Sequence, residues 1–185
     1  MAIPINIEDL LNKRKIESNR IEFKKGWNPD KIYRTICAFA NDFDNIGGGY
    51  IVVGIEEEER TGIAKRPVTG VPIEALNDIQ KDMVGYNNKI EPYYMPRIDV
   101  QEVDGKSVLV IWAPAGVNRP YNVRERVTAK QSPSKWYIRS GTSTIEAKGE
   151  VLDELREMAN RTPFDERGNE RIEISDISPA LVLDY

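Results

Sequence analysis

The sequence contains no histidine and a single cysteine, and both shortages narrow the chemistry that the chain can perform. Without an imidazole it lacks the usual catalytic base and the commonest metal-binding nitrogen, so Ser-His-Asp triads and His-based zinc sites are excluded. Because Cys37 is alone, no disulfide can form within the chain, which suits a reducing compartment. The sequence therefore predicts a cytoplasmic protein that does not depend on disulfides.

Long hydrophobic runs are also missing. The longest, Tyr50–Ile55 and Val108–Pro114, fall far short of the roughly 20 residues that a membrane helix needs. The N-terminus has no signal-like hydrophobic segment. With 185 residues, of which 40% are hydrophobic and 30% charged, the chain is typical of one soluble globular domain with a terminal extension. We expect no membrane partner.

Charge is distributed unevenly around a formal net value of −4. An acidic total disfavours polyanion binding through bulk charge, so any nucleic-acid contact requires a local basic face. Residues 118–148 supply a candidate, with seven Lys and Arg against two Asp and Glu, interleaved with Tyr121, Trp136 and Tyr137. This mixture suits phosphate contacts with base stacking. The alternative is a surface loop whose aromatic side chains belong to the core.

Hydrophobic periodicity predicts an α/β (α+β) fold in which one mixed β-sheet packs with helices. Asp104-Gly105, between two alternating segments, is typical of a type I′ hairpin turn. Residues 117–133 are expected to form a long basic loop. The main strands are expected near residues 20–24, 50–55, 97–103, 106–113 and 136–139. The helices are expected near residues 6–15, 30–44, 73–84 and 149–159.

Gly47-Gly48-Gly49 invites comparison with a phosphate-binding loop. Such loops run from strand to glycines to helix, so that helix N–H groups point at the phosphates. Here the expected order is helix, glycines, strand, and no Gly-Lys-Ser/Thr follows. We interpret the triplet as a helix stop with close backbone packing, and ATP binding there is not expected. Cys37, on the apolar side of the same helix, is expected in the core.

Acidic residues raise the possibility of a metal site. Glu17, Glu22 and the run Glu56–Glu59 offer carboxylate oxygens, which Mg²⁺ and Mn²⁺ accept without histidine. Glu17 and Glu22 would lie on opposite faces of a regular strand, so they converge only if Glu17 precedes the strand. The alternative is that these side chains are simply solvated, as charge runs usually are.

Several ordered strings resemble the Schlafen AlbA-type domain over about residues 12–160. They are ESNRIEFK at 17–24, ICAFAN at 36–41, GGGYIVVGI at 47–55, RPY at 119–121 and WYIRSGTST at 136–144. The resemblance implies an α/β domain that serves as a DNA-binding module in chains resembling transcriptional regulators or helicases. It also implies a domain over residues 1–160, followed by an acidic tail, 161–185, leading toward a C-terminal domain absent from this chain.

The same resemblance implies a second activity. In animal Schlafen ribonucleases, two glutamates of the first string and an acid after the glycine-containing strand form a metal-dependent RNA-cleaving site. Matched position by position, these are Glu17, Glu22 and Glu57. Where those nucleases resemble Gly-Val-Asp-Asp, this chain has Glu56 and Glu57 after Gly54-Ile55, a longer side chain at the third position.

The leading hypothesis is therefore a nucleic-acid-binding module of a transcriptional regulator, with DNA favoured over RNA and with neither catalysis nor cofactor. The first alternative is a Mg²⁺- or Mn²⁺-dependent endoribonuclease using Glu17, Glu22 and Glu57. The second is a protein-interaction module, with a homodimer as one form. The residues expected to contact phosphates are Lys24, Lys25, Arg119, Arg124, Arg126 and Arg139.

Overall fold

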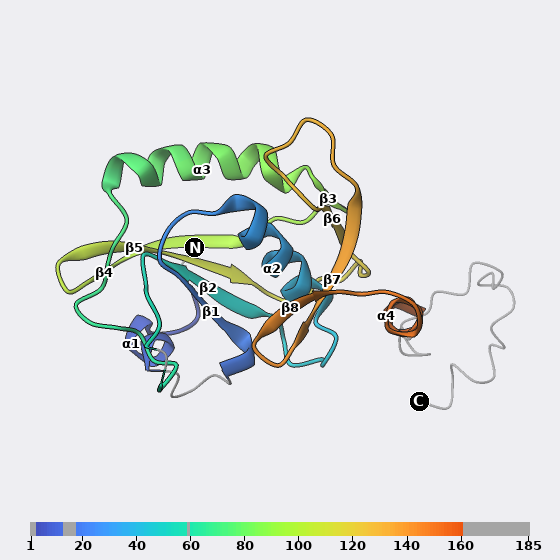
Figure 1. The fold of residues 1–185 in the computed structure, drawn as a ribbon, viewed down its shortest axis with the longest axis horizontal. Helices are drawn as coiled ribbons and strands as arrows, with labels where there is room; N and C mark the ends of the chain where they lie inside the picture. The colour runs from blue at the N-terminus through green and yellow to red at the C-terminus, as the bar shows by residue number, and fades with distance from the viewer. Residues whose placement is uncertain (1–2, 13–17, 59, 161–185) are drawn as a thin grey trace, which may run out of the picture.

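Two four-stranded β-sheets and a helix shared between them organise the chain, in a computed structural model that describes residues 3–12, 18–58 and 60–160 (Figure 1). The α+β class with a mixed sheet packed with helices is confirmed. Glu17 and the expected tail, 161–185, lie outside the described residues. The helical elements are α1 (Ile7–Leu11), the 3₁₀ turn η1 (Ser18–Arg20), α2 (Pro29–Asn41), α3 (Ile73–Asn87) and α4 (Glu150–Asn160).

The first sheet is mixed and has the strand order β1-β2-β5-β4. β1 and β2 run parallel, and the other pairs are antiparallel. Every residue of β2 is buried, as the continuous β-branched run predicts for a central strand. Asp104 and Gly105 have φ of 51° and 71°, which confirms the predicted I′ turn. The strands are β1 (Ile21–Lys24), β2 (Gly49–Val53), β4 (Arg97–Val103) and β5 (Lys106–Ala113).

The second sheet is antiparallel, in the order β3-β6-β7-β8. The strand expected near residues 136–139 belongs to this sheet and not to a single mixed one. The expected loop 117–133 contains one of its strands, in which Val123 is buried between two half-buried polar neighbours. Three residues are too few for periodicity to reveal. The strands are β3 (Ile90–Glu91), β6 (Asn122–Arg124), β7 (Ser134–Ser140) and β8 (Ser143–Glu146).

Helix α2 packs against both sheets. The Asn28 side chain accepts a hydrogen bond from the Lys31 N–H at 3.2 Å, and Pro29 suits the first turn. The helix ends at Asn41, before the predicted residue 44, because Asp42 adopts a left-handed conformation with φ of 43°. Because α2 packs against both sheets, most of its side chains are buried, and its apolar residues belong to the hydrophobic core.

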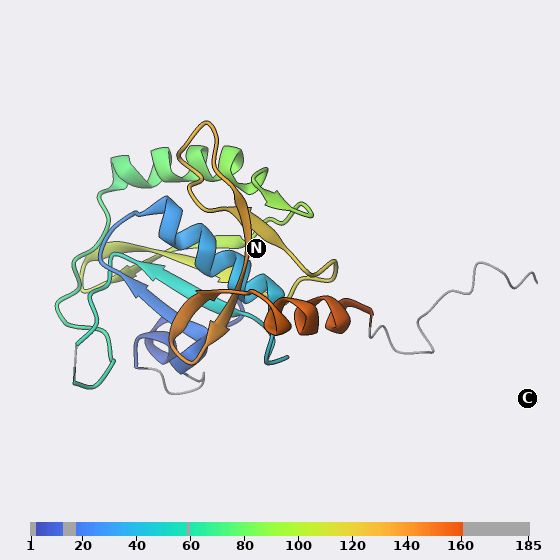
Figure 2. The ribbon, with the colours of Figure 1, turned by 45° about the vertical axis from the view of Figure 1, so that its right-hand side comes forward.

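The remaining helices cover different surfaces. α3 and α2 lie on one face of the first sheet, and Leu10 and Leu11 of α1 pack on the other (Figure 1). Leu155 of α4 packs against Ile138 of β7, at the end of the molecule opposite the β4–β5 hairpin (Figure 2). None of the helices in the described ranges combines the length and apolar character that a membrane crossing requires.

Candidate nucleic-acid interface

A partly buried ion pair joins the two sheets at Glu22 of β1 and Arg139 of β7. Arg139 Nη1 donates to Glu22 Oε2 at 3.0 Å, although only 7% of the Arg139 side chain is exposed. The guanidinium also donates to the Asn19 carbonyl at 3.2 Å and the Thr142 carbonyl at 2.6 Å. Its centre lies 5.1 Å from the centroid of the Phe39 ring. These contacts direct Arg139 inward, where it fixes the β7–β8 turn.

A polar hollow opens beside this ion pair. It has a volume of about 340 Å³ and lies between the end of β1, the first half of α2 and the β7–β8 turn. Lys24 borders it and also binds the second carboxylate oxygen of Glu22. Because Lys24 and Arg139 together offset Glu22, Lys31 and Arg34 give the hollow a positive charge. The lining residues are Glu22, Lys24, Lys31, Arg34, Thr35, Thr142, Ser143 and Thr144.

Hydroxyl groups form the other wall of the hollow. Thr144 Oγ accepts a hydrogen bond from Arg139 at 2.9 Å and lies 3.1 Å from Thr35 Oγ. Thr142 and Ser143 are exposed on the turn. Cationic side chains facing hydroxyl groups across a small concavity are the donors that phosphate oxygens accept.

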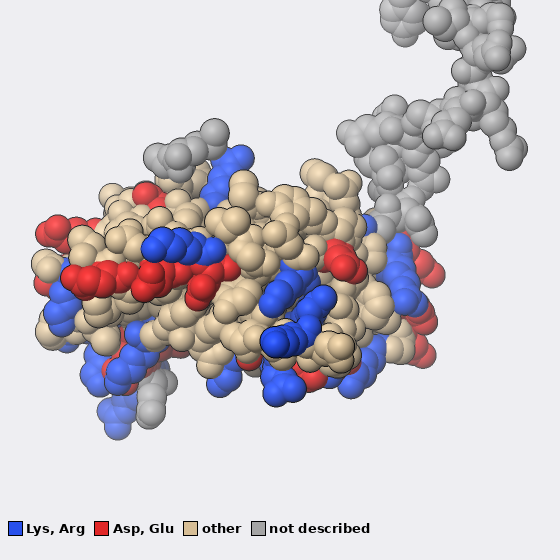
Figure 3. Space-filling view, turned by 90° about the horizontal axis from the view of Figure 1, so that it is seen from above, with Lys and Arg blue, Asp and Glu red and all other residues tan. Residues whose placement is uncertain are grey.

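The β6–β7 loop adjoins the same end of α2. Arg34 Nε donates to the Glu125 carbonyl at 3.0 Å, and the Thr128 N–H donates to the Asp30 carboxylate at 3.0 Å. Lys135 bridges Glu125 and Glu146, and its hydrogen bond lowers the pKa of Glu125. Figure 3 looks onto α3 and this loop: Lys and Arg side chains gather over the loop, whereas α3 presents a row of carboxylates.

Three other predicted phosphate contacts lie in separate surroundings. Arg119 Nη1 donates to the carbonyls of Asn41 and Asp42, at 3.3 and 3.1 Å, and so caps the C-terminal end of α2. Lys25 is exposed and pairs with Glu56 at 3.3 Å. Arg124 donates to the Lys130 carbonyl at 3.1 Å. Of the predicted set, Lys24 and Arg139 are brought together around Glu22, and Arg126 is exposed on the β6–β7 loop.

The glycine turn holds a carboxylate of the protein itself. The backbone N–H groups of residues 46, 47 and 48 all donate to Asp42, at 3.0 to 3.1 Å. Arg20 donates to the carbonyls of Gly47 and Gly48. Converging N–H groups of this kind bind anions in other proteins, but here the Asp42 carboxylate takes that place. This geometry agrees with a structural role for the triplet.

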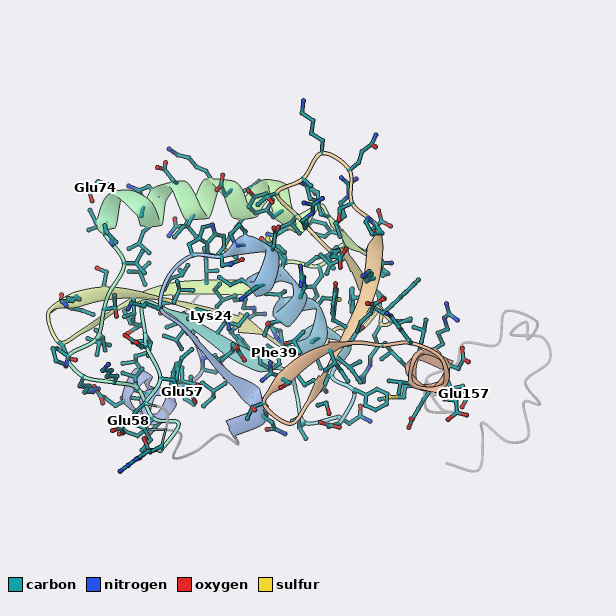
Figure 4. All side chains as sticks on the ribbon, viewed as in Figure 1. Lys24, Phe39, Glu57, Glu58, Glu74 and Glu157 are labelled. Atoms are coloured by element: carbon teal, nitrogen blue, oxygen red, sulfur yellow. The ribbon has the colours of Figure 1, made fainter. Side chains whose placement is uncertain are left out.

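Only two of the three carboxylates in the endoribonuclease alternative, Glu22 and Glu57, lie within the described residues. Glu22 forms ion pairs with Lys24 and Arg139. Glu57 follows β2, its side chain is exposed, and its backbone forms an isolated β-bridge with Ala64. Figure 4 shows Glu57 toward the end of the molecule that holds α1, and Lys24 and Phe39 nearer its centre. In the described ranges no three acidic or cysteine side chains gather as metal ligands. Because Glu17 lies outside those ranges, the endoribonuclease alternative stays a prediction.

Lys31, Arg34 and Thr35 were not singled out from the sequence. Their positions in α2 are i, i+3 and i+4, a spacing that places the three side chains on neighbouring turns of the helix. That spacing was available as a signal, because the apolar residues of the helix define its opposite side. What the sequence did not reveal is that this polar stripe faces Lys24 and the β7–β8 turn.

The chain is thus an α+β domain whose mixed and antiparallel sheets share a central helix. It belongs to the family described as Schlafen, AlbA_2, whose sequence pattern matches residues 17–148. No curated protein matches the chain.

The solved structures that are similar to the chain include the following two. One is the "N-terminal Domain of Putative ATP-dependent DNA Helicase RecG-related Protein" from Nitrosomonas europaea, with 26% identity and a TM-score of 0.46, covering 69% of this chain and 78% of that one. The other is the DIP2311 protein from Corynebacterium diphtheriae, with 20% identity and a TM-score of 0.48, covering 89% of this chain and 33% of that one.

Proposed function

We propose that this domain binds nucleic acid, with duplex DNA as its ligand, as the DNA-contacting module of a transcriptional regulator and without chemistry of its own. The polar hollow carries this proposal. Its three cations, Lys24, Lys31 and Arg34, come from β1 and α2 and face the hydroxyl groups of the β7–β8 turn. This arrangement suits a backbone phosphate, which accepts hydrogen bonds from charged and hydroxyl donors together.

The charge balance of the hollow supports an anionic ligand. Glu22 is the only carboxylate among its described lining residues, and Arg139 already pairs with it from the buried side. Within the described residues, the Lys31 ammonium has no ion-pair partner, so it is available to a phosphate. At physiological salt, screening acts over about 8 Å, so the charges that line the hollow contribute most to its local potential.

The β6–β7 loop extends the cationic surface along a bound strand. Contacts from Arg34 to Glu125 and from Asp30 to Thr128 hold this loop against α2. Arg126 and Lys130 on the loop are exposed. In this proposal Arg126 and Lys24 contact phosphates directly, whereas Arg119 and Arg139 act by positioning the backbone.

Salt dependence of binding tests the proposal. Fluorescence anisotropy with labelled duplex DNA should give affinities that fall steeply with salt, because each neutralised phosphate adds about 0.9 to the log-log slope. The double variant Lys31→Gln/Arg34→Gln should reduce that slope by roughly 2. Arg34→Lys keeps the charge and should preserve most of the slope.

A matched control is available on α3. Lys81 is 78% exposed and pairs only with Asp78 among the described residues, so Lys81→Gln removes one charge from α3, outside the lining of the hollow. It should leave the slope unchanged. A loss of about 0.9 in Lys81→Gln, half that of the two-charge variant, would show that the charge acts in bulk and would contradict a site at the hollow. Tighter binding to duplex RNA of the same sequence would contradict DNA as the ligand.

A further inference from the structure

Strand β4 is a free edge of the first sheet. It pairs with β5 along all seven of its residues, and no other described strand lies beyond it. Free edges expose backbone N–H and C=O groups that can pair with another chain. Unlike many edges, β4 is neither short nor interrupted by proline.

The hydrogen-bonding pattern shows which groups are free. Val103 and Lys106 flank the two-residue turn and form a hydrogen-bonded pair, so every second residue from Val103 points its backbone toward β5. The Ser107 carbonyl, opposite Glu102, points away from β4 and accepts the Val71 N–H at 2.7 Å, as this alternation requires. The backbone groups of Ile98, Val100 and Glu102 therefore face outward.

Apolar side chains accompany this edge. Val100 is 39% exposed although it shares the α3 face of the sheet with buried neighbours. A groove of about 280 Å³ beside the start of β4 is lined by Met83, Val84, Met95 and Ile98, of which Val84 and Met95 are exposed. Edge pairing with an apolar component buries more surface than backbone pairing alone.

We propose that β4 pairs with β4 of a second copy of this chain, antiparallel and about a two-fold axis at Val100. This inference is independent of the proposed function. With a two-fold axis perpendicular to the sheet, the same face of both copies lies on the same side of the joined sheet. Two residues that lie opposite each other across the axis must then have numbers whose sum is even. The register with Val100 opposite Val100 pairs Ile98 with Glu102 of the second copy and employs all three outward-facing residues of each strand.

This register is self-complementary, which favours a second copy over an unrelated peptide. On the axis, Val100 meets its own copy through an apolar contact. On the opposite face, Asp99 lies across from Gln101 of the second copy, so a carboxylate meets an amide donor. Shifting the register by two toward residue 97 would place Asp99 against Asp99 and leave fewer outward groups paired. The sequence of β4 thus favours one alignment.

One contact within the chain competes with this pairing. Asp99 Oδ1 accepts the Val100 N–H at 3.1 Å, and the bond is exposed to solvent. A single solvated bond of this kind contributes little compared with the set of backbone bonds that pairing forms. The competition predicts weak, concentration-dependent association and not an obligate dimer.

Sedimentation equilibrium of the full chain over a wide concentration range tests the proposal. We expect reversible dimerisation. Val100→Lys places two ammonium groups opposite each other on the axis and should raise the dimer dissociation constant by about tenfold or more. Val117→Lys is the control, because Val117 is 92% exposed and belongs to neither β4 nor β5, so the dissociation constant should not change.

Hydrogen exchange provides a second measurement that does not depend on a variant. The outward amides of Val100 and Glu102 should gain protection as protein concentration rises, whereas the amide of Asp99, already bonded to β5, should not. Circular dichroism and thermal melting establish that Val100→Lys is folded. A chain that stays monomeric at every concentration, or a dimer that Val100→Lys leaves intact, would overturn the proposal.

Discussion

Asn41 and Tyr121 form a two-point pairing that joins the end of α2 to the segment before β6. The Asn41 side chain accepts the Tyr121 N–H at 2.7 Å and donates to the Tyr121 carbonyl at 2.9 Å. The same amide donates to the Tyr137 carbonyl at 2.8 Å. Asn41 is fully buried, so one side chain satisfies three backbone groups that water cannot reach.

Replacing this side chain should destabilise the domain strongly. Asn41→Leu leaves the buried Tyr121 N–H and Tyr137 carbonyl without the bonds to Asn41, and leaves the Tyr121 carbonyl with only the weak Cys37 Sγ donor at 3.3 Å. We expect a loss of about 2–4 kcal/mol in the free energy of unfolding. Urea denaturation followed by tryptophan fluorescence measures it. Asn77→Ala, at an exposed position of α3, should cost nothing. Similar losses in both variants would argue against the pairing as the cause.

Replacing either of two glycines by alanine should change the stability of the fold, but in opposite directions. A Cβ at Gly48 would lie 2.2 Å from the Ala113 carbonyl oxygen, and the residue has φ of +77°. Gly85, within α3, has no atom within 4 Å of that position. Gly48→Ala should therefore destabilise the fold, and Gly85→Ala should stabilise it by about 0.5–1 kcal/mol. Thermal melting compares the two. Stabilisation by Gly48→Ala would show that the turn relaxes.

Local patterns predicted much of the first sheet and its helices. The run before Gly54, the Asp104-Gly105 turn and the apolar spacing of α2 each specify a conformation through neighbouring residues, and each was confirmed. The second sheet was missed in part because β3 and β6 are two and three residues long. Strands of that length depend on their partners and carry no periodicity of their own.

The polar hollow could not be predicted from local patterns, because it is formed by contacts between residues that are distant in the sequence. Arg139 looks like one cation among several in residues 118–148, yet it is 117 positions from the carboxylate that it binds. Asn41 looks like the end of a helix, and its partners lie 80 and 96 positions away. A single sequence shows which side chains are charged or polar, but the pairing of the two sheets decides which of them remain accessible.

The role of Arg139 can be separated from direct phosphate contact. Arg139→Lys keeps the charge but loses the planar set of donors that binds Glu22, Asn19 and Thr142. We expect it to destabilise the fold by roughly 2 kcal/mol, because the Arg139 side chain that makes these contacts is buried. Denaturation measures that loss. DNA affinity should fall while the salt slope stays unchanged, whereas a slope reduced by about 0.9 on Arg139→Gln would show that Arg139 contacts a phosphate itself.

Alkaline pH should destabilise the domain through Cys37. Burial raises the pKa of the Cys37 thiol to about 12, whereas an unfolded thiol titrates near roughly 8.5. Between these values the unfolded chain releases a proton that the folded chain keeps, so stability is constant below the unfolded pKa and falls as pH rises toward the folded one. Each such group contributes a slope of about 1.4 kcal/mol per pH unit.

The dependence of stability on pH in a variant identifies Cys37 as the group that causes this loss of stability. Burial also raises the pKa of Tyr33 and of Tyr94, but unfolded tyrosines titrate near roughly 10, so the thiol acts first. Cys37→Ala lowers stability at every pH by removing packed atoms, yet the decline between about pH 8.5 and 10 should become shallower than in the parent chain. Urea denaturation at closely spaced pH values measures both slopes. Parallel curves for the two proteins would mean that the folded thiol ionises as readily as the unfolded one.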